Sequence, residues 1–160
     1  GKKLATLISE ELWQPMGAEE DANITVDSAG YGLSCGGISS TLRDFARFGI
    51  LHLNGGKLNG KKIIPSDWID DIRSGNHGLA NESLRATYPN GKYRNQFWIE
   101  DASKTTVMCI GVFGQLIYIA PEYNMVVVKF STWPDFVDNT HKLNTLSAIH
   151  AIAENYKGKG

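Results

Sequence analysis

Residues Thr106–Ser131 read TVMCIGVFGQLIYIAPEYNMVVVKFS, the densest run of β-branched and aromatic residues in the chain. Within it, Leu116–Ile119 and Met125–Phe130 flank the turn-forming segment Ala-Pro-Glu-Tyr-Asn, a pattern typical of an antiparallel β-hairpin. The Val126–Val128 run predicts a strand that is buried on both faces, in the middle of a sheet rather than at its edge. We therefore expect the rest of the chain to cover this sheet.

A third extended run, Thr106–Ile110, precedes the hairpin and ends at Gly111, with Gly114 three residues later. Glycine at these two points lets another backbone segment or a ligand approach without a Cβ in the way. The two glycines therefore predict a close backbone contact, or a close approach of a ligand, at this corner.

Hydrophobic periodicity and turn residues divide the remainder of the chain into helices and short extended segments. Helices are predicted over Lys2–Trp13, from Ser39 or Ser40 to Asn54, over Pro65–Ile72 and over Leu143–Tyr156, with extended segments over Ile24–Val26 and Gln96–Ile99 and a hairpin around Asn59-Gly60. Asp44 is expected on the exposed face of its helix and Trp68 on the buried face of its own. Ser74–Asn90 has no periodicity and predicts a long surface loop. Helices followed by consecutive antiparallel strands and a final helix indicate an α+β fold.

The composition excludes several classes of protein. With 160 residues, 42% hydrophobic and 21% charged, the chain suits one globular domain, and a net charge of −1 gives no reason to expect nucleic acid or an anionic membrane as partner. No apolar run approaches the roughly 20 residues that span a bilayer, and no signal peptide or cofactor fingerprint is visible. Cys35 and Cys109 form neither a disulfide framework nor a zinc motif, which favours reduced thiols in a cytoplasmic protein. No cofactor or metal is expected.

One short motif points to nucleophilic catalysis. Gly32–Gly36 reads GLSCG and matches the G-x-S-x-G pattern of a nucleophile elbow, with Ser34 as nucleophile. Carboxylates and histidines further along would complete a triad in the order Ser, Asp, His: Asp101 or Asp135, then His141 or His150. An elbow needs a hydrophobic strand that runs into the serine and a helix directly behind it, and both are absent from the pattern here. A structural glycine loop is the favoured interpretation, and the elbow is the alternative.

Several longer stretches are more specific in combination. Gly36–Gly49 reads GGISSTLRDFARFG, and together with Gly1–Gly17, Asn54–Trp68 and Gly111–Lys129 it resembles the serine β-lactamase-related hydrolases, the family of class C β-lactamases and similar carboxylesterases. The resemblance covers essentially the whole chain. It implies the β-lactamase and penicillin-binding-protein fold, of which residues 1–160 would be a single partial domain, the C-terminal portion, with helices packed on an antiparallel sheet.

Within that family, three stretches resemble the 6-aminohexanoate-dimer hydrolase branch: Asp21–Asp27, Thr87–Tyr93 and Ser131–Asp135. Family members take a nucleophilic Ser and a Lys from a Ser-x-x-Lys motif, and a Tyr from a Tyr-x-Asn element. The chain has no Ser-x-x-Lys and no initial Met, so we expect both elements upstream of Gly1. Tyr88 and Tyr93 lie in a different block and are not assigned as the catalytic tyrosine.

The resemblance also implies specific site residues. The family's Lys-Thr-Gly slot falls on Cys109-Ile110-Gly111, so its usual lysine is replaced, and Lys104 lies before this strand; antibiotic hydrolysis is therefore not expected. The residue after the slot donates a backbone N–H to the oxyanion hole, which implies Val112 as the catalytic donor, beside Gly111. Trp98 is similar to an aromatic residue that lines the substrate pocket, and Cys35 occupies the position of a substrate-contacting polar residue, commonly Asn. Ordinary packing is the alternative for Trp98 and Cys35.

The implied function is that of a serine hydrolase, which cleaves a small-molecule amide or ester through an acyl-serine intermediate. The alternative is a non-catalytic relative that acts as a binding or interaction module. Without the missing N-terminal part of its own domain, this chain is expected to lack hydrolase activity. It is also expected to aggregate or to form a homodimer, because part of a fold leaves a sheet edge and apolar helix faces uncovered.

Overall fold

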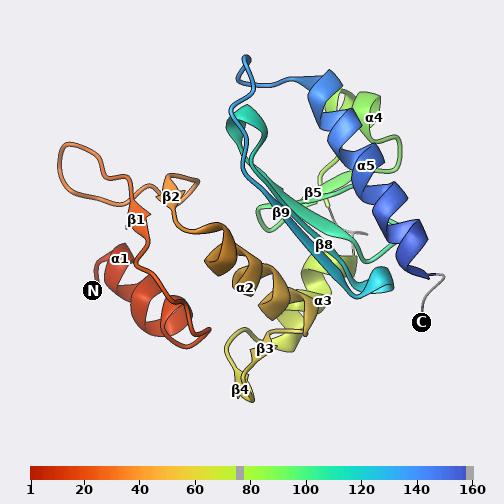
Figure 1. Ribbon diagram of the computed structural model, residues 1–160. Coiled ribbons are helices and arrows are strands. Elements are labelled where there is room, and N and C mark those ends of the chain that lie inside the picture. Colours follow the sequence, from red (N-terminus) through yellow and green to blue (C-terminus); the bar gives the residue numbers. More distant parts are fainter. Residues whose placement is uncertain (75–77, 158–160) are drawn as a thin grey trace.

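The computed structural model describes residues 1–74 and 78–157, which form helices and three antiparallel sheets (Figure 1). The helical elements are α1 (Leu4–Ile8), the π-helix η1 (Ser9–Trp13), α2 (Leu42–Leu53), α3 (Ser66–Ser74), α4 (Glu82–Thr87), the 3₁₀ turns η2 (Val112–Gly114) and η3 (Pro121–Tyr123), and α5 (Asn139–Lys157). The strands are β1 (Asn23–Ile24), β2 (Ile38–Ser39), β3 (Lys57–Leu58), β4 (Lys61–Lys62), β5 (Lys92–Arg94), β6 (Phe97–Ile99), β7 (Val107–Ile110), β8 (Leu116–Ala120) and β9 (Met125–Lys129).

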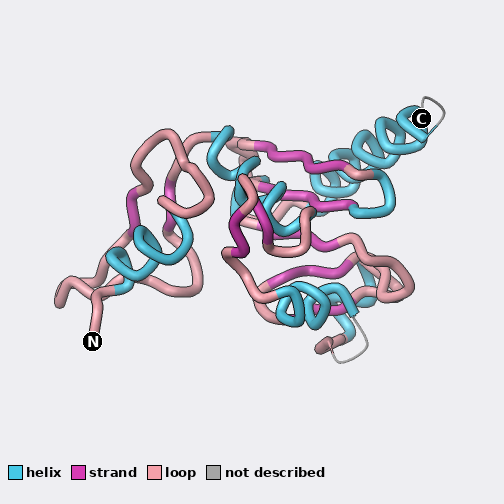
Figure 2. Tube along the Cα trace, turned by 90° about the horizontal axis from the view of Figure 1, so that it is seen from below, coloured by secondary structure: helices cyan, strands magenta, loops and turns pink. Residues whose placement is uncertain are grey.

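The main sheet contains five strands in the order β5-β6-β7-β8-β9, so each strand pairs with its neighbour in sequence. Figure 2 shows strands of the sheet lying side by side. The predicted hairpin is confirmed as β8 and β9, with Tyr118 opposite Val127, and the turn between them ends at Asn124 in the left-handed region. The third predicted run is confirmed as β7, which pairs with β8. The α+β prediction is therefore confirmed.

The predicted place of the valine run in the sheet is wrong. β9 is a border strand, and its five residues are partly buried rather than enclosed on both faces. The run is apolar on both sides because one face of β9 packs on α2 and the other on the core beneath α5. Burial of the two faces says nothing about whether the outer edge has a partner.

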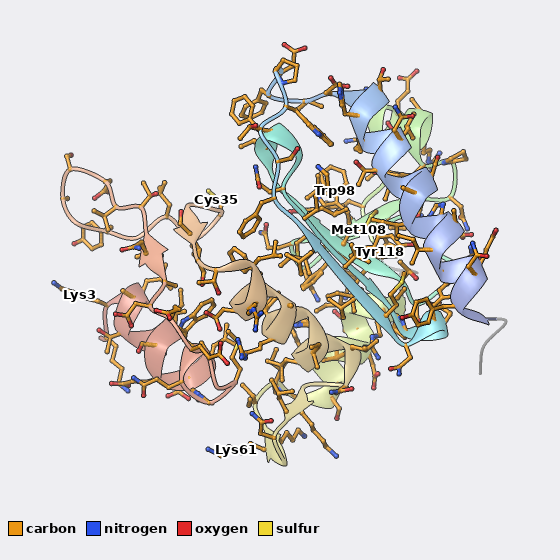
Figure 3. All side chains as sticks on the ribbon, viewed as in Figure 1. Lys3, Cys35, Lys61, Trp98, Met108 and Tyr118 are labelled. Atoms are coloured by element: carbon orange, nitrogen blue, oxygen red, sulfur yellow. The ribbon has the colours of Figure 1, made fainter. Side chains whose placement is uncertain are left out.

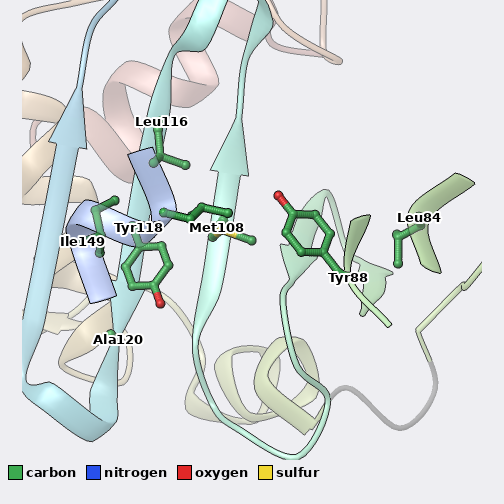
Figure 4. Close-up of a cluster of buried hydrophobic side chains, with 8 residues drawn as sticks. Leu84, Tyr88, Met108, Leu116, Tyr118, Ala120 and Ile149 are labelled. Carbon is green, nitrogen blue, oxygen red and sulfur yellow. The ribbon is translucent and has the colours of Figure 1, made fainter. Parts of the chain in front are cut away.

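α5 and α4 cover one face of this sheet. Met108 and Tyr118 lie between the sheet and α5 (Figure 3), and they belong to a buried cluster with Leu84 of α4 and Leu146 and Ile149 of α5 (Figure 4). This layer covers Met108 of β7 and alternate residues of β8, Leu116, Tyr118 and Ala120. Within residues 1–74 and 78–157, no helix combines the length and the apolar character needed to cross a bilayer.

α2 covers the opposite face and packs across β8 and β9. The approach is close because Gly49 has no side chain: a Cβ there would lie 2.5 Å from Cγ1 of Val126. The other side of α2 packs on the N-terminal helix through a second buried group, Trp13, Met16 and Leu51. α2 is therefore the layer between the N-terminal unit and the sheet, as Figure 1 shows.

Asp44, expected to face solvent, is fully buried. Its carboxylate accepts hydrogen bonds from the backbone amides of Glu19 (2.9 Å) and Glu20 (3.2 Å), from the Thr41 hydroxyl (2.8 Å) and from the Arg47 guanidinium (2.9 Å). Burial raises the pKa of Asp44, but these donors outweigh it and lower the pKa below its usual range. The hydrogen bonds of Asp44 therefore hold the segment after η1 against the start of α2.

Two further expectations need correction. Trp68 is 51% exposed, whereas its neighbour Ile69 is buried as predicted. The Ser74–Asn90 segment, predicted as a loop, contains α4, whose first turn is capped by the Asn81 side chain accepting from the Leu84 amide at 2.8 Å. Its positions 75–77 lie outside the described residues. Six residues give too short a periodic pattern to predict, and the helix is held by the burial of Leu84 and Tyr88 in the core.

Buried His52 lies near the end of α2, between the rings of Phe48 (centroids 4.3 Å apart) and Phe97 (5.2 Å). Its Nδ1 lies 2.9 Å from the Phe48 carbonyl oxygen, while Arg73 donates to the carbonyls of His52 and Leu53 at the end of the helix. Burial and the nearby Arg73 charge lower the pKa of His52 to about 4, against the opposing effect of the bond to Phe48.

Gly49→Ala is expected to destabilise the protein by about 1–3 kcal/mol, because the added methyl forces α2 away from Val126. Alanine is the better helix former, so this loss would appear despite a gain of up to about 1 kcal/mol in helix propensity. The matched control is Gly36→Ala, whose Cβ meets nothing within 4 Å and which is expected to change stability by less than about 0.5 kcal/mol. Urea unfolding midpoints measure both, and equal midpoints would disprove the close contact.

The pKa of His52 predicts a pH dependence of stability. Above pH 6.5 the imidazole is neutral in both the folded and unfolded states; below it the unfolded state binds a proton that the folded state refuses until about pH 4. Stability is therefore lost as the pH falls from 6.5 to 4, by up to about 3 kcal/mol from this residue alone. The measurement is the free energy of unfolding as a function of pH for wild type and for His52→Gln. The difference between the two profiles removes the contribution of the carboxylates, which titrate in both proteins. Parallel profiles would contradict the prediction.

Candidate functional site

The corner that joins β7 to β8 is the 3₁₀ turn η2, preceded by Gly111 in extended conformation. The turn is closed by hydrogen bonds from the Gly111 amide to the Gln115 carbonyl (2.9 Å) and from the Gln115 amide to the Val112 carbonyl (3.4 Å). Phe113 at its centre has φ 54° and ψ 24°, in the left-handed region that non-glycine residues rarely adopt. The corner is thus a specific, strained backbone shape at the end of the sheet.

Val112, the implied oxyanion donor, is the first residue of this turn and is 43% exposed. Among the described residues, none accepts a hydrogen bond from its backbone N–H, whereas the amides of Gly111, Phe113 and Gln115 are all bonded. Unpaired backbone donors are uncommon in folded proteins unless they meet water or a ligand. The Val112 amide is therefore available to an incoming acceptor.

A lysine contributes charge beside the corner, which sequence reasoning did not identify. Nζ of Lys129, at the end of β9, donates to the Gly114 carbonyl at 3.3 Å and lies 4.6 Å from the ring centroid of Trp133. Burial lowers the pKa of Lys129 from its usual value. The only signal in the sequence was the position of this lysine at the end of an apolar strand.

Beside the corner, a cavity of about 10 Å³ lies on the α5 side of the sheet, lined in part by Ile110, Gly114, Trp133 and Tyr88. The Tyr88 hydroxyl is buried and has no hydrogen-bond partner among the described residues. Burial, and secondly the charge of Glu100, raise the pKa of Tyr88 to about 12. Tyr88 therefore stays protonated at neutral pH, which agrees with leaving it unassigned as a catalytic base.

The structure places the other implied residues in separate surroundings. Trp98 is partly buried on the α5 side, edge-on to Tyr93 with ring centroids 4.9 Å apart, and its strand partner is Met108. Met108 precedes Gly111 by three residues, about 10 Å along the strand. Cys35 lies exposed in the β1–β2 loop, and Figure 3 shows it well apart from Trp98. Trp98 therefore lies on the strand next to β7 and away from the corner, and the described residues show no contact from Cys35 to Trp98 or Val112.

The family resemblance implies that the Lys-Thr-Gly slot falls on β7 at Cys109, a residue without charge. Burial raises the pKa of the Cys109 thiol to about 12. Lys104 lies in the turn before β7, where its amide donates to the Asp101 carbonyl at 3.0 Å. The strand therefore presents a neutral surface next to the corner.

Ser34 lies in an irregular loop, with Val26 and Gly32 joined by an isolated bridge before it and β2 after it. Three of the four residues that could have completed a triad have other partners: Asp101 accepts from Ser103 and Asn90, His141 pairs with Asp138 (2.6 Å) and His150 with Glu100 (3.1 Å). The described residues contain no group of three or more His, Cys, Asp and Glu side chains able to hold a metal ion. This geometry favours the structural glycine loop over the elbow.

Comparison with known proteins gives a consistent set of relatives. No family model matches the chain. A curated protein from Paenarthrobacter ureafaciens, 6-aminohexanoate-dimer hydrolase, is 34% identical over 137 residues, which is 84% of this chain and 35% of that protein. The chain thus spans about a third of this relative and corresponds to its C-terminal part.

Solved structures agree in fold. A Bacillus anthracis protein assigned as a 6-aminohexanoate-dimer hydrolase superposes with a TM-score of 0.83 at 33% identity, over 99% of this chain and 40% of its own. A Bacteroides dorei protein assigned as a β-lactamase gives a TM-score of 0.59 at 14% identity, over 87% of this chain and 48% of its own. The second likeness supports the β-lactamase-like fold alone.

The two thiols are expected to differ sharply in reactivity. At pH 8, exposed Cys35 should react with an aromatic disulfide reagent, whereas Cys109, with a pKa of about 12, has a thiolate fraction of only about 10⁻⁴. The measurement is the time course with which the reagent releases its aromatic thiolate. One equivalent should be released rapidly by the native protein and by Cys109→Ser, and this fast phase should be absent in Cys35→Ser. Two fast equivalents in the native protein would show that the slot on β7 is open.

Proposed function

Because the chain belongs to the β-lactamase-related hydrolase family, in the branch of the 6-aminohexanoate-dimer hydrolases, we propose that it is the C-terminal portion of a serine hydrolase domain. The domain cleaves an amide or ester bond through an acyl-serine intermediate. The observation that carries the proposal is the free backbone N–H of Val112 on a fixed turn at the end of the sheet. Preorganised donors of this kind stabilise the oxyanion of acyl transfer.

The preceding segment of the domain supplies the serine nucleophile and the lysine and tyrosine that move its proton. Attack of the serine oxygen on the substrate carbonyl forms a tetrahedral oxyanion, to which Val112 donates its N–H. The carbonyl then re-forms, the amine or alcohol leaves with a proton, and water hydrolyses the acyl-serine in the same two steps. The Lys129 charge, 3.3 Å from the Gly114 carbonyl, adds a favourable positive potential at the corner.

The substrate proposed is a small amide or ester rather than a β-lactam. The neutral Cys109 in the family's lysine position leaves the β7 strand without a charge to bind a carboxylate. Trp98, partly buried against the cluster on the α5 side of the sheet, is the proposed aromatic wall of the substrate pocket. Cys35, exposed on its loop, is the second proposed substrate contact, at the position that the family resemblance gives to a polar side chain.

The rest of the domain is the proposed partner of this chain. β9 is a border strand, and the corner and the end of β9 carry exposed apolar side chains, Val112, Phe113 and Phe130. Open strand edges and apolar patches favour association. The chain alone is expected to self-associate and to lack hydrolase activity.

A hybrid protein tests the proposal: the part of the Paenarthrobacter ureafaciens hydrolase that precedes the matched region, fused to this chain. We expect it to hydrolyse p-nitrophenyl acetate and to be labelled by a fluorophosphonate on the serine of the added part, while the chain alone does neither. Labelling of Ser34 would revive the nucleophile elbow. A folded hybrid without activity would favour a non-catalytic binding module.

Within the hybrid, Val112→Pro removes the N–H at a position that tolerates proline, because Val112 is the first residue of a helical turn and Gly111 before it is extended. The expected loss in kcat is about a hundredfold or more. Leu42→Pro is the matched control, an exposed first residue of α2 preceded by extended Thr41. Val112→Ala, which keeps the amide, should lose far less than Val112→Pro. Equal rates for Val112→Pro and the control would disprove the role of the amide.

A further inference from the structure

The segment after β9 crosses the corner and binds it on several sides; we call residues 131–137 the clamp loop. Both backbone groups of Phe113 are bonded to this loop, its amide to the Phe136 carbonyl (3.1 Å) and its carbonyl to the Trp133 amide (3.2 Å). The rings of Phe113 and Phe136 also meet edge to face, with centroids 5.7 Å apart. The strained centre of the turn is therefore held from outside the β7–β8 hairpin.

The clamp loop is itself fixed at its first residue. The Gln115 side chain donates to the Ser131 carbonyl at 2.6 Å and accepts from the Ser131 amide at 3.1 Å. This pair of bonds joins the residue after the turn to the residue that starts the loop. The turn and the loop thus form one hydrogen-bonded unit.

Trp133 makes the closest contact. Gly114 has φ +88°, and a Cβ on it would lie 2.5 Å from Cδ2 of the Trp133 ring, so the indole lies against the bare backbone of the turn. The ring is fixed in turn by Lys129, whose Nζ is 4.6 Å from its centroid, and by His141, at 5.7 Å between centroids. The tryptophan therefore fills the space that a side chain at position 114 would occupy.

The turn needs this support because two consecutive residues, Phe113 and Gly114, have positive φ. A non-glycine residue in the left-handed region costs about 1–2 kcal/mol, so the turn would relax if nothing opposed it. A relaxed turn would rotate the Val112–Phe113 peptide and the neighbouring Val112 N–H. The clamp loop bonds Phe113 and leaves the Val112 amide free.

We propose that Trp133 is a positioning residue for oxyanion stabilisation: packed against Gly114, it holds the η2 turn in the shape that directs the Val112 N–H toward the reacting carbonyl. The inference rests on the proposed function. Trp133 touches no reacting atom, and its effect is to keep the donor in place before the charge develops. Donors fixed in advance are the ones that lower a barrier, and misplacement by about 1 Å costs up to about a hundredfold.

The first test uses the hybrid protein. Trp133→Ala is expected to lower kcat by about 10- to 100-fold with KM changed less than about threefold, since the oxyanion exists only in the transition state. Trp133→Phe, which restores a flat ring against Gly114, should recover most of the loss, and Gly114→Ala should lower kcat as Trp133→Ala does. The matched control is Trp68→Ala, a 51% exposed tryptophan on α3 that is expected to keep the wild-type kcat.

A second measurement, on the 160-residue chain, does not need activity. Hydrogen exchange of the Phe113 amide should quicken at least tenfold in Trp133→Ala and stay unchanged in Trp68→Ala, relative to amides of the α2 core. The inference is wrong if Trp133→Ala leaves the exchange rate of the Phe113 amide unchanged. It is also wrong if Trp133→Ala leaves kcat unchanged in an active hybrid, and in both cases the proposed function still stands. An inactive wild-type hybrid with quickened exchange in Trp133→Ala overturns the proposed function while supporting the clamp.

Discussion

The contact between Gly49 and Val126 is the constraint on which the other layers depend. Because residue 49 lacks a side chain, α2 lies directly on β8 and β9. The ends of α2 then hold other parts of the chain: buried Asp44 binds the amides of Glu19 and Glu20, and the carbonyls at its end accept from Arg73 of α3. A single helix thus fixes the N-terminal unit, the sheet and α3 with respect to one another.

The candidate site uses the rigidity of this arrangement. With α2 on one face and α5 on the other, β7 and β8 have little freedom, and the turn between them is held in an unfavourable backbone shape by hydrogen bonds and by an indole ring. Bonds from the amides of Gly111, Phe113 and Gln115 fix the turn, while no acceptor among the described residues bonds the Val112 amide. Strain, support and an available donor therefore occur together, as is common where backbone groups serve a function.

The hairpin and the corner could be predicted from the sequence, because their signals lie close together in the chain. The β-branched runs and the turn at Pro121 defined the hairpin, and Gly111 and Gly114 marked the corner, because these signals act within a few residues. The border position of β9 and the burial of Asp44 could not be predicted, since both depend on partners far away in the chain: Asp44 is bonded to amides about 25 residues earlier. The role of Trp133 was hidden for the same reason. Val112 came from family resemblance, and the structure adds that its amide has no acceptor among residues 1–74 and 78–157.

The order of the strands has a kinetic consequence. Each strand of β5–β9 pairs with the next along the chain, so the sheet can close through short loops at low entropic cost. Docking of α2 on β9 instead brings together residues about 77 positions apart, from 49 to 126. This difference in contact order favours early formation of the sheet and its turn, with the glycine-faced helix adding later. The strained turn would then form first in a flexible state, and the later docking of α2 on the sheet would make it rigid.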